Sequence, residues 1–163
     1  MWPKTVCIIG HAEKPEDPHD PNLSPQGVER AQALAKNCEK LFGKLDCLFA
    51  AETSAVSARS VETIDPLAQT IHVEIDSGVS NKDYSVLAAK LLAGPTDCGG
   101  KTVLICWHHE NIPEFAQRLR AVNAPGNWMS EVFDRIWVLE YQSSGEGYFQ
   151  DLAQNLLPAD SKN

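Results

Sequence analysis

Two histidines and one arginine have the types and positions that would support chemistry. His11 follows the apolar run V-C-I-I-G, and His108 follows the apolar run K-T-V-L-I-C-W. Arg59 falls in the first turn of a predicted helix, where a cation opposes the helix dipole. A neutral imidazole attacks a phosphoryl group well when fixed cations hold the phosphoryl oxygens. This set of residues therefore suggests phosphoryl transfer, and a surface pairing of Arg59 with Glu52 or Glu62 is the alternative for the arginine.

Other kinds of site have less support in the sequence. Two histidines and a carboxylate would bind zinc, but no H-E-x-x-H or comparable spacing of ligands is present. A G-x-S-x-G elbow, a Walker loop and a G-x-G-x-x-G loop are also missing from the sequence, which argues against serine hydrolases, P-loop enzymes and dinucleotide-binding enzymes. We therefore expect neither a metal nor a cofactor.

The elements that must position these residues alternate between strand and helix. Apolar runs predict strands at 6–9, 45–51, 71–76 and 101–107, and an edge or outer strand at 135–141. Helical spacing predicts helices at 24–43, 57–69, 84–94 and 111–119. This alternation predicts an α/β protein, a three-layer α/β/α sandwich with a mostly parallel central sheet. The carboxyl ends of parallel strands share one edge, so His11, Arg59 and His108 are expected to meet there.

Composition limits the class of protein and its partners. The 163 residues suit a single domain, 1–163, with a C-terminal tail from about 156 to 163 that we expect to be disordered. A net charge of −8 argues against nucleic acid or an anionic membrane as the main partner. The five cysteines form no C-x-x-C pair and suggest buried free thiols in a reducing compartment. With no signal-like or membrane-spanning run, we expect a cytoplasmic protein.

Four motifs in the same order resemble those of the histidine phosphatase, or phosphoglycerate mutase-like, superfamily, especially its short single-domain members. They are I-I-G-H-A-E-K-P, L-S-P-Q-G-V-E-R-A-Q-A-L, S-A-V-S-A-R-S-V-E-T and V-L-I-C-W-H-H-E-N-I-P. The resemblance covers most of the chain. It implies the phosphoglycerate mutase-like fold, phosphorylation of His11, phosphate binding by Arg59 and a transition-state role for His108.

The chain departs from the family pattern at two positions. Gly10 stands where the family has an arginine immediately before the nucleophile, and Trp107 stands where it usually has a small residue before the second histidine. Loss of a guanidinium clamp would weaken transition-state stabilisation. We expect Gly10, Trp107 and His109 to line a reshaped pocket. Packing of Trp107 in the core, and a helix-capping role for His109 and its neighbours, are the alternatives.

The general acid is not fixed by spacing. Family members often use a carboxylate beyond the second arginine, where this chain has Glu74, Asp76 and Asp83, and Glu13 is a nearer candidate. Asp76 and Glu13 are the residues we select. A good leaving group such as phosphorylated imidazole would need no acid.

Three functions fit these residues. The first is a metal-independent phosphatase that hydrolyses a phosphate monoester or phosphohistidine, on a small phosphorylated metabolite or a phosphoprotein, through phospho-His11. The second is a weakened pseudophosphatase with a binding or regulatory role. The third is an enzyme that uses the same scaffold for different acid–base chemistry. The substrate and the oligomeric state cannot be read from these residues.

Overall fold

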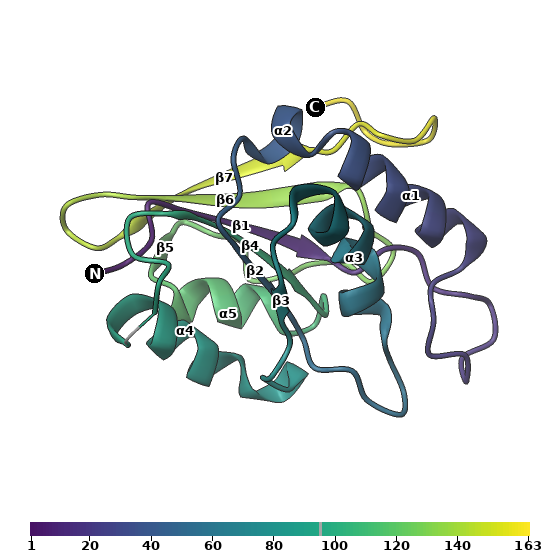
Figure 1. The fold of residues 1–163 in the computed structure, drawn as a ribbon, viewed down its shortest axis with the longest axis horizontal. Helices are drawn as coiled ribbons and strands as arrows, with labels where there is room; N and C mark the ends of the chain where they lie inside the picture. Colours follow the sequence, from purple (N-terminus) through teal and green to yellow (C-terminus); the bar gives the residue numbers. More distant parts are fainter. Residues whose placement is uncertain (95) are drawn as a thin grey trace.

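A seven-stranded sheet forms the centre of the computed structural model, which describes residues 1–94 and 96–163 (Figure 1). The strands are β1 (Thr5–Gly10), β2 (Cys47–Ala50), β3 (Ile75–Asp76), β4 (Thr102–Trp107), β5 (Ala121–Val122), β6 (Arg135–Tyr141) and β7 (Gly147–Ala153). The helices are α1 (Pro25–Lys36), α2 (Cys38–Phe42), α3 (Arg59–Ile71), α4 (Tyr84–Ala93) and α5 (Ile112–Arg118), with a single 3₁₀ turn, η1 (Asn81–Asp83).

The sheet is mostly parallel, as the alternating pattern predicted. Its strand order is β3-β2-β4-β1-β6-β7-β5. Strands β3, β2, β4 and β1 run parallel to one another, and β6 lies antiparallel between β1 and β7. The four parallel strands therefore send their carboxyl ends to one edge, where a ligand site is expected in such a sheet.

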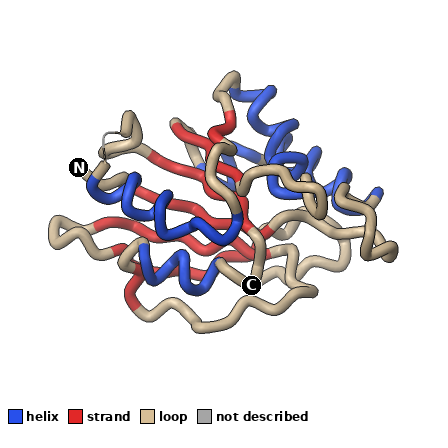
Figure 2. Tube along the Cα trace, turned by 90° about the horizontal axis from the view of Figure 1, so that it is seen from below, coloured by secondary structure: helices blue, strands red, loops and turns tan. Residues whose placement is uncertain are grey.

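Helices cover the two faces of the sheet and create two separate cores (Figure 2). On one face, Leu87 of α4 and Phe115 of α5 pack against Ile8 and Ile105. On the other face, α1, α2 and α3 pack against the alternate strand residues, which include Ile9 and Cys106. Because successive strand side chains point to opposite faces, one buried run supplies both cores. The predicted three-layer sandwich is thus confirmed.

Several elements differ from the sequence-based expectations. The helix predicted to end near Gly43 is interrupted at Asn37, whose side-chain amide donates to the carbonyl of Ala33 and so competes with the helical ladder. The strand predicted at 71–76 is only Ile75–Asp76, since α3 continues to Ile71. Strand β6, expected at an edge, is paired on both sides, and β7 beyond it was not predicted.

The C-terminal tail from about residue 156, for which the sequence suggests disorder, makes contacts with the body of the protein. Asp160 forms an ion pair with Arg30, and the Ser161 amide donates to Asp134. The expectation of five free thiols is wrong for two of them, because Cys47 and Cys98 form a disulfide. No helix in the described part of the chain is long and apolar enough to cross a membrane.

Candidate active site

Two adjacent parallel strands bring His11 and His108 together. Gly10 of β1 is paired with Trp107 of β4, so the next residue of each strand emerges at the same level of the sheet edge. The His11 amide donates to the Trp107 carbonyl over 3.1 Å. The two imidazole rings meet edge to face, with centroids 5.4 Å apart. His11 and His108, which follow two apolar runs far apart in the sequence, therefore lie side by side in the structure.

One hydrogen bond identifies the tautomer of neutral His11. Its Nδ1 lies 2.7 Å from the carbonyl oxygen of Ala12, and a carbonyl only accepts, so Nδ1 carries the proton. The neighbouring peptide is held in turn, because the Ala12 amide donates to Thr63 Oγ1 over 2.9 Å. Neutral His11 therefore presents the unprotonated Nε2, the nitrogen that has a lone pair available for attack.

The site keeps both histidines neutral. Burial lowers the pKa of His11 to about 4; the hydrogen bond to Ala12 opposes this shift, and the charges of His108, Arg59 and His109 add to it. Burial also lowers the pKa of His108, opposed by Glu110 and reinforced by Arg59 and His109. The charges of Arg59 and His109 thus contribute to the shifts of both His11 and His108.

The low pKa of His11 makes the stability of the protein dependent on pH. In the unfolded chain a histidine has a pKa of about 6.5, so between that pH and about 4 the unfolded state binds more protons. We expect the free energy of unfolding to fall by roughly 3 kcal/mol from this group as the pH drops through that window. Urea unfolding at several pH values, for native protein and His11→Asn, measures the difference.

The exposed His19 provides the matched control for this prediction. Its side chain is 93% exposed, so His19→Asn should leave the pH dependence of unfolding as in the native protein. An equal pH dependence in native protein and His11→Asn would contradict the assignment of a buried neutral imidazole at position 11.

Arg59 begins α3 and is buried at the same end of the sheet. Its Nε donates to the carbonyl of Asn22 over 3.0 Å and its Nη2 to the carbonyl of Asp20 over 2.5 Å. The Ala58 amide also donates to Pro21, so the proline-rich loop after His11 is fixed on the start of α3. The alternative partner Glu62 accepts instead from the amide of Leu23. Arg59 is therefore a buried loop-binding cation rather than a solvated one.

An indole lies beside Gly10, at the position of the missing family arginine. A Cβ atom built on Gly10 would lie 3.5 Å from Cζ2 of Trp128, which is ordinary van der Waals contact. Trp128 is itself buried, donates from Nε1 to the Val132 carbonyl and packs on Trp137 with ring centroids 5.0 Å apart. There is room for a methyl group at position 10, and a longer side chain that extends toward Trp128 would collide with the indole.

This packing predicts different outcomes for two substitutions of Gly10. Gly10→Ala should change the free energy of unfolding by less than about 1 kcal/mol, whereas Gly10→Arg should destabilise by about 1–3 kcal/mol through overpacking. Urea denaturation of both variants measures the two values. Equal stability of Gly10→Arg and Gly10→Ala would show that Trp128 moves away without cost.

Trp107 lies in the core and not at the pocket surface. It is fully buried, packs edge to face on Phe115, and its Nε1 donates to the Asn81 carbonyl over 3.0 Å. The expectation that Trp107 lines the pocket is therefore wrong, and the alternative, packing of Trp107 in the core, is what the structure has. His109 is 30% exposed, with Nε2 3.6 Å from Glu110. Its place in the pocket stays a prediction.

Neither selected general acid is free to protonate a leaving group. Both carboxylate oxygens of Glu13 accept from Arg30, and the carboxylate is nearly buried. Asp76 forms an ion pair with Lys90 and accepts from the Gly78 amide, on a strand separated from β1 by β2 and β4. Each of these two carboxylates therefore has a structural partner, and the choice of a general acid stays a prediction.

Two residues near the histidines, Phe133 and Trp128, were not singled out from the sequence. The Phe133 ring lies 6.3 Å from that of His11 and lines a surface depression together with Glu131 and the segment Glu13–Glu16. Trp128 lies beside Gly10, as described above. Phe133 and Trp128 both come from the irregular segment before β6, and no periodic pattern marks them. Burial raises the pKa of Glu110, but hydrogen bonds from its own amide and from Asn81, together with the charges of His108 and His109, outweigh burial and lower the pKa.

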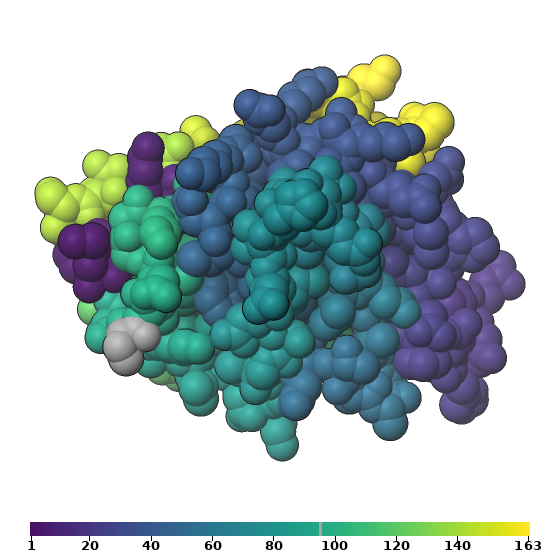
Figure 3. Space-filling view, viewed as in Figure 1, coloured from purple at the N-terminus to yellow at the C-terminus, as the bar shows by residue number. Residues whose placement is uncertain are grey.

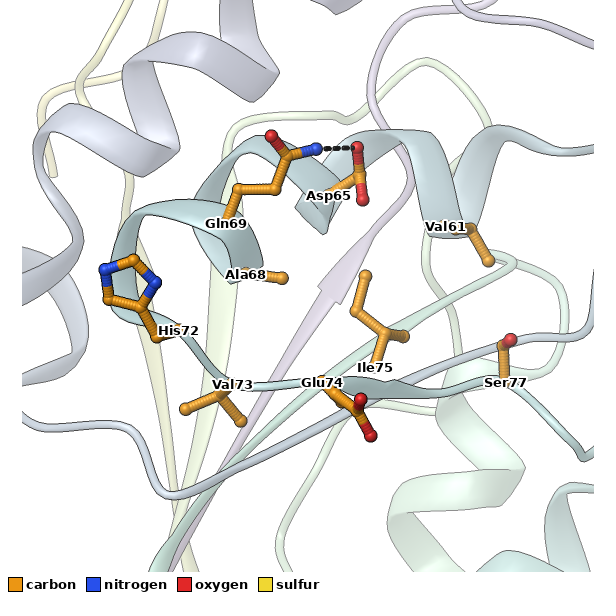
Figure 4. A pocket seen from close by; sticks show the side chains of 9 residues that line it. All are labelled: Val61, Asp65, Ala68, Gln69, His72, Val73, Glu74, Ile75 and Ser77. Carbon is orange, nitrogen blue, oxygen red and sulfur yellow. Dashed lines mark hydrogen bonds between the residues drawn. The ribbon is translucent and has the colours of Figure 1, made fainter.

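A second surface hollow lies away from the histidines, between α3 and β3 (Figure 4). Asp65 and Gln69 project from α3 on one side and are joined by a hydrogen bond, and Glu74 lies on the other side. None of His11, Arg59 or His108 lines it. Within residues 1–94 and 96–163, no three His, Cys, Asp or Glu side chains are grouped closely enough to hold a metal ion.

Comparison with solved structures gives the same fold. The protein histidine phosphatase SixA, solved with tungstate, superposes with a TM-score of 0.69 at 15% identity, over 92% of this chain and 97% of SixA. A mycobacterial glucosyl-3-phosphoglycerate phosphatase gives 0.65 at 13% identity, over 93% and 97%. Phosphoglycerate mutase from Plasmodium falciparum gives 0.61 at 14% identity, over 100% and 99%.

Comparison by sequence finds no such likeness. No family model and no curated protein matches the chain. The expected phosphoglycerate mutase-like fold is nevertheless confirmed, since these structures agree over nearly the whole of both chains.

Proposed function

We propose that the chain is a histidine phosphatase that hydrolyses its substrate through a phosphohistidine at His11. The observation that carries this proposal is the hydrogen bond from His11 Nδ1 to the Ala12 carbonyl, which leaves Nε2 unprotonated beside His108. A nucleophile in this state needs no base to activate it. The fold shared with SixA and with other phosphatases supports the same reaction class.

The reaction has two displacements. In the first, the lone pair of His11 Nε2 forms a bond to phosphorus while the bond from phosphorus to the leaving group breaks. In the second, water attacks the phosphohistidine, the P–N bond breaks, and inorganic phosphate leaves with His11 neutral again. His108, as a neutral imidazole, donates one N–H to a phosphoryl oxygen, and Arg59 supplies positive charge.

The substrate we propose is one whose leaving group needs no proton from the protein. Glu13 and Asp76 are engaged by Arg30 and Lys90, and the lowered pKa of Glu110 keeps that carboxylate ionised. An alkoxide leaving group requires an acid, whereas the protonated imidazole of a phosphohistidine departs as a neutral base. Phosphohistidine, on a phosphoprotein or a small molecule, therefore fits this site better than an alkyl phosphate.

Phosphate release from matched substrates tests this proposal. Purified protein is incubated with a phosphohistidine peptide, an aryl phosphate and an alkyl phosphate of similar size. We expect kcat/KM to fall in that order, because the leaving group becomes poorer along the series. Equal rates for all three would indicate an unrecognised acid, and no release from any would contradict the phosphatase proposal.

A pseudophosphatase is the second candidate, favoured by the contact between Trp128 and the Gly10 position. Gly10 stands where the family has its first arginine, and the Trp128 indole lies next to the position that a side chain there would start from. Such a protein would bind tungstate or phosphate at His11, His108 and Arg59 without turnover. Calorimetric binding of tungstate combined with no phosphate release would support this candidate over the first.

A further inference from the structure

A buried ionic network joins the C-terminal tail to the segment that follows His11. The Arg30 guanidinium, on α1, donates to both oxygens of Glu13, to both oxygens of Asp160 and to Oε1 of Gln154, over 2.7–3.1 Å. The side chains of Arg30, Glu13 and Asp160 are 3%, 9% and 4% exposed. Figures 1 and 3 show the yellow tail lying against α1.

Asp160 is a permanent anion within this network. Its burial raises its pKa, but hydrogen bonds from Arg30 and from the amides of Leu156 and Leu157 outweigh burial and lower the pKa to about 2. Arg30 therefore has two carboxylate partners, one from the tail and one from the segment after His11. Loss of either carboxylate would leave N–H donors of the buried guanidinium without their acceptors.

The same tail also binds the other wall of the depression beside His11. The Gln154 amide donates to the Asp134 carbonyl over 2.8 Å, and the Ser161 amide donates to the Asp134 carboxylate over 2.7 Å. Asp134 follows Phe133, whose ring faces His11. The tail thus connects the segment of Glu13 with the segment of Phe133, and these two segments line one depression.

The two-residue segment Ala12–Glu13 is held by three contacts. The Ala12 amide donates to Thr63, the Glu13 carbonyl accepts from the Ser24 amide, and the Glu13 carboxylate is held by Arg30. The Ala12 carbonyl within this segment accepts the Nδ1 proton of His11. Movement of Glu13 would therefore move the acceptor that selects the tautomer of the nucleophile.

We propose that Arg30 and Asp160 are positioning residues through which the C-terminal tail holds the Ala12–Glu13 peptide and so keeps His11 in its Nδ1–H tautomer. This inference rests on the proposed nucleophilic role of His11. It assigns to residues 154–161 a function in catalysis, although none of them touches the reacting atoms.

The test substitutes Asp160→Asn and reads the His11 ring directly. Nitrogen-15 NMR of histidine-labelled protein reports the tautomer of His11 without any turnover. We expect native protein to show the Nδ1–H form, and Asp160→Asn to show a mixture of both tautomers. We also expect kcat for phosphate release to fall about tenfold, with KM within about twofold of native, because misplacement affects the reacting geometry more than binding.

Asp65→Asn is the matched control, since Asp65 is exposed on α3, accepts a hydrogen bond from Gln69 and lines the hollow away from the histidines. It should leave the tautomer and kcat as in native protein. If Asp160→Asn does not fold, Glu13→Gln replaces it, with the same expected mixture of tautomers.

A folded Asp160→Asn or Glu13→Gln that keeps the native His11 tautomer would overturn the proposal. A second outcome is that the substitution changes the His11 tautomer while the native protein releases no phosphate from any substrate. This outcome would support the positioning role and contradict the phosphatase function.

Discussion

His11→Ala is expected to lower kcat/KM for phosphate release by about four orders of magnitude or more, as for removal of a nucleophile in other enzymes. The substitution removes Nε2, which forms the bond to phosphorus in the first displacement, and no other imidazole occupies its position next to the Ala12 carbonyl. His108 would keep its place beside the phosphate but lies on the next strand. The measurement is steady-state phosphate release from the phosphohistidine peptide.

The control for this result is His19→Ala, the same change at an exposed loop position. It should retain native kcat/KM. Loss of less than about tenfold in His11→Ala would mean that phosphate is released by direct attack of water or by another residue, and the covalent mechanism would be wrong.

Arg59→Ala is expected to lower kcat/KM by about 100- to 1,000-fold, the range found for loss of a preorganised transition-state donor. Two effects combine here. The positive charge beside both histidines is lost, and the carbonyls of Asp20 and Asn22 lose their donor, so the proline-rich loop loosens. In a site without the family's first arginine, no second guanidinium is expected to compensate for the loss.

Arg59→Lys separates the two effects. A lysine keeps the charge but cannot make the pair of planar donations to the loop, so activity between native and Arg59→Ala is expected. Arg118→Ala, at an exposed position in the last turn of α5, is the control and should be native-like. Native activity in Arg59→Ala would exclude this residue from phosphate binding.

The central sheet was predictable because its strands are buried on both faces. The runs at β1 and β4 are continuously apolar, and such runs between helical patterns indicate parallel strands. Strand β7 was missed because Gly147–Ala153 is mostly exposed and contains polar residues at both alternations. The interior position of β6 depended on β7, so missing one strand misplaced the other.

The two histidines of the site were predictable from the same strands, since residues that follow adjacent parallel strands must lie together. The errors concern side chains with distant partners. Trp107 is the last residue of β4, and its alternation turns it to the core face with Phe115. Glu13 forms an ion pair with Arg30, which also pairs with Asp160 near the other end of the chain. A contact between residues so far apart in the sequence leaves no local pattern that could predict it.

The central claim, a covalent phosphoryl group on His11, is tested most directly by trapping it. Native protein is mixed with a radiolabelled phosphoryl donor and quenched in alkali, where phosphohistidine survives, and the labelled peptide is then identified by mass spectrometry. We predict label on His11, at Nε2 by phosphorus NMR, and none in His11→Ala. Release of phosphate by native protein with no label on His11, or with label on another residue, would contradict the account.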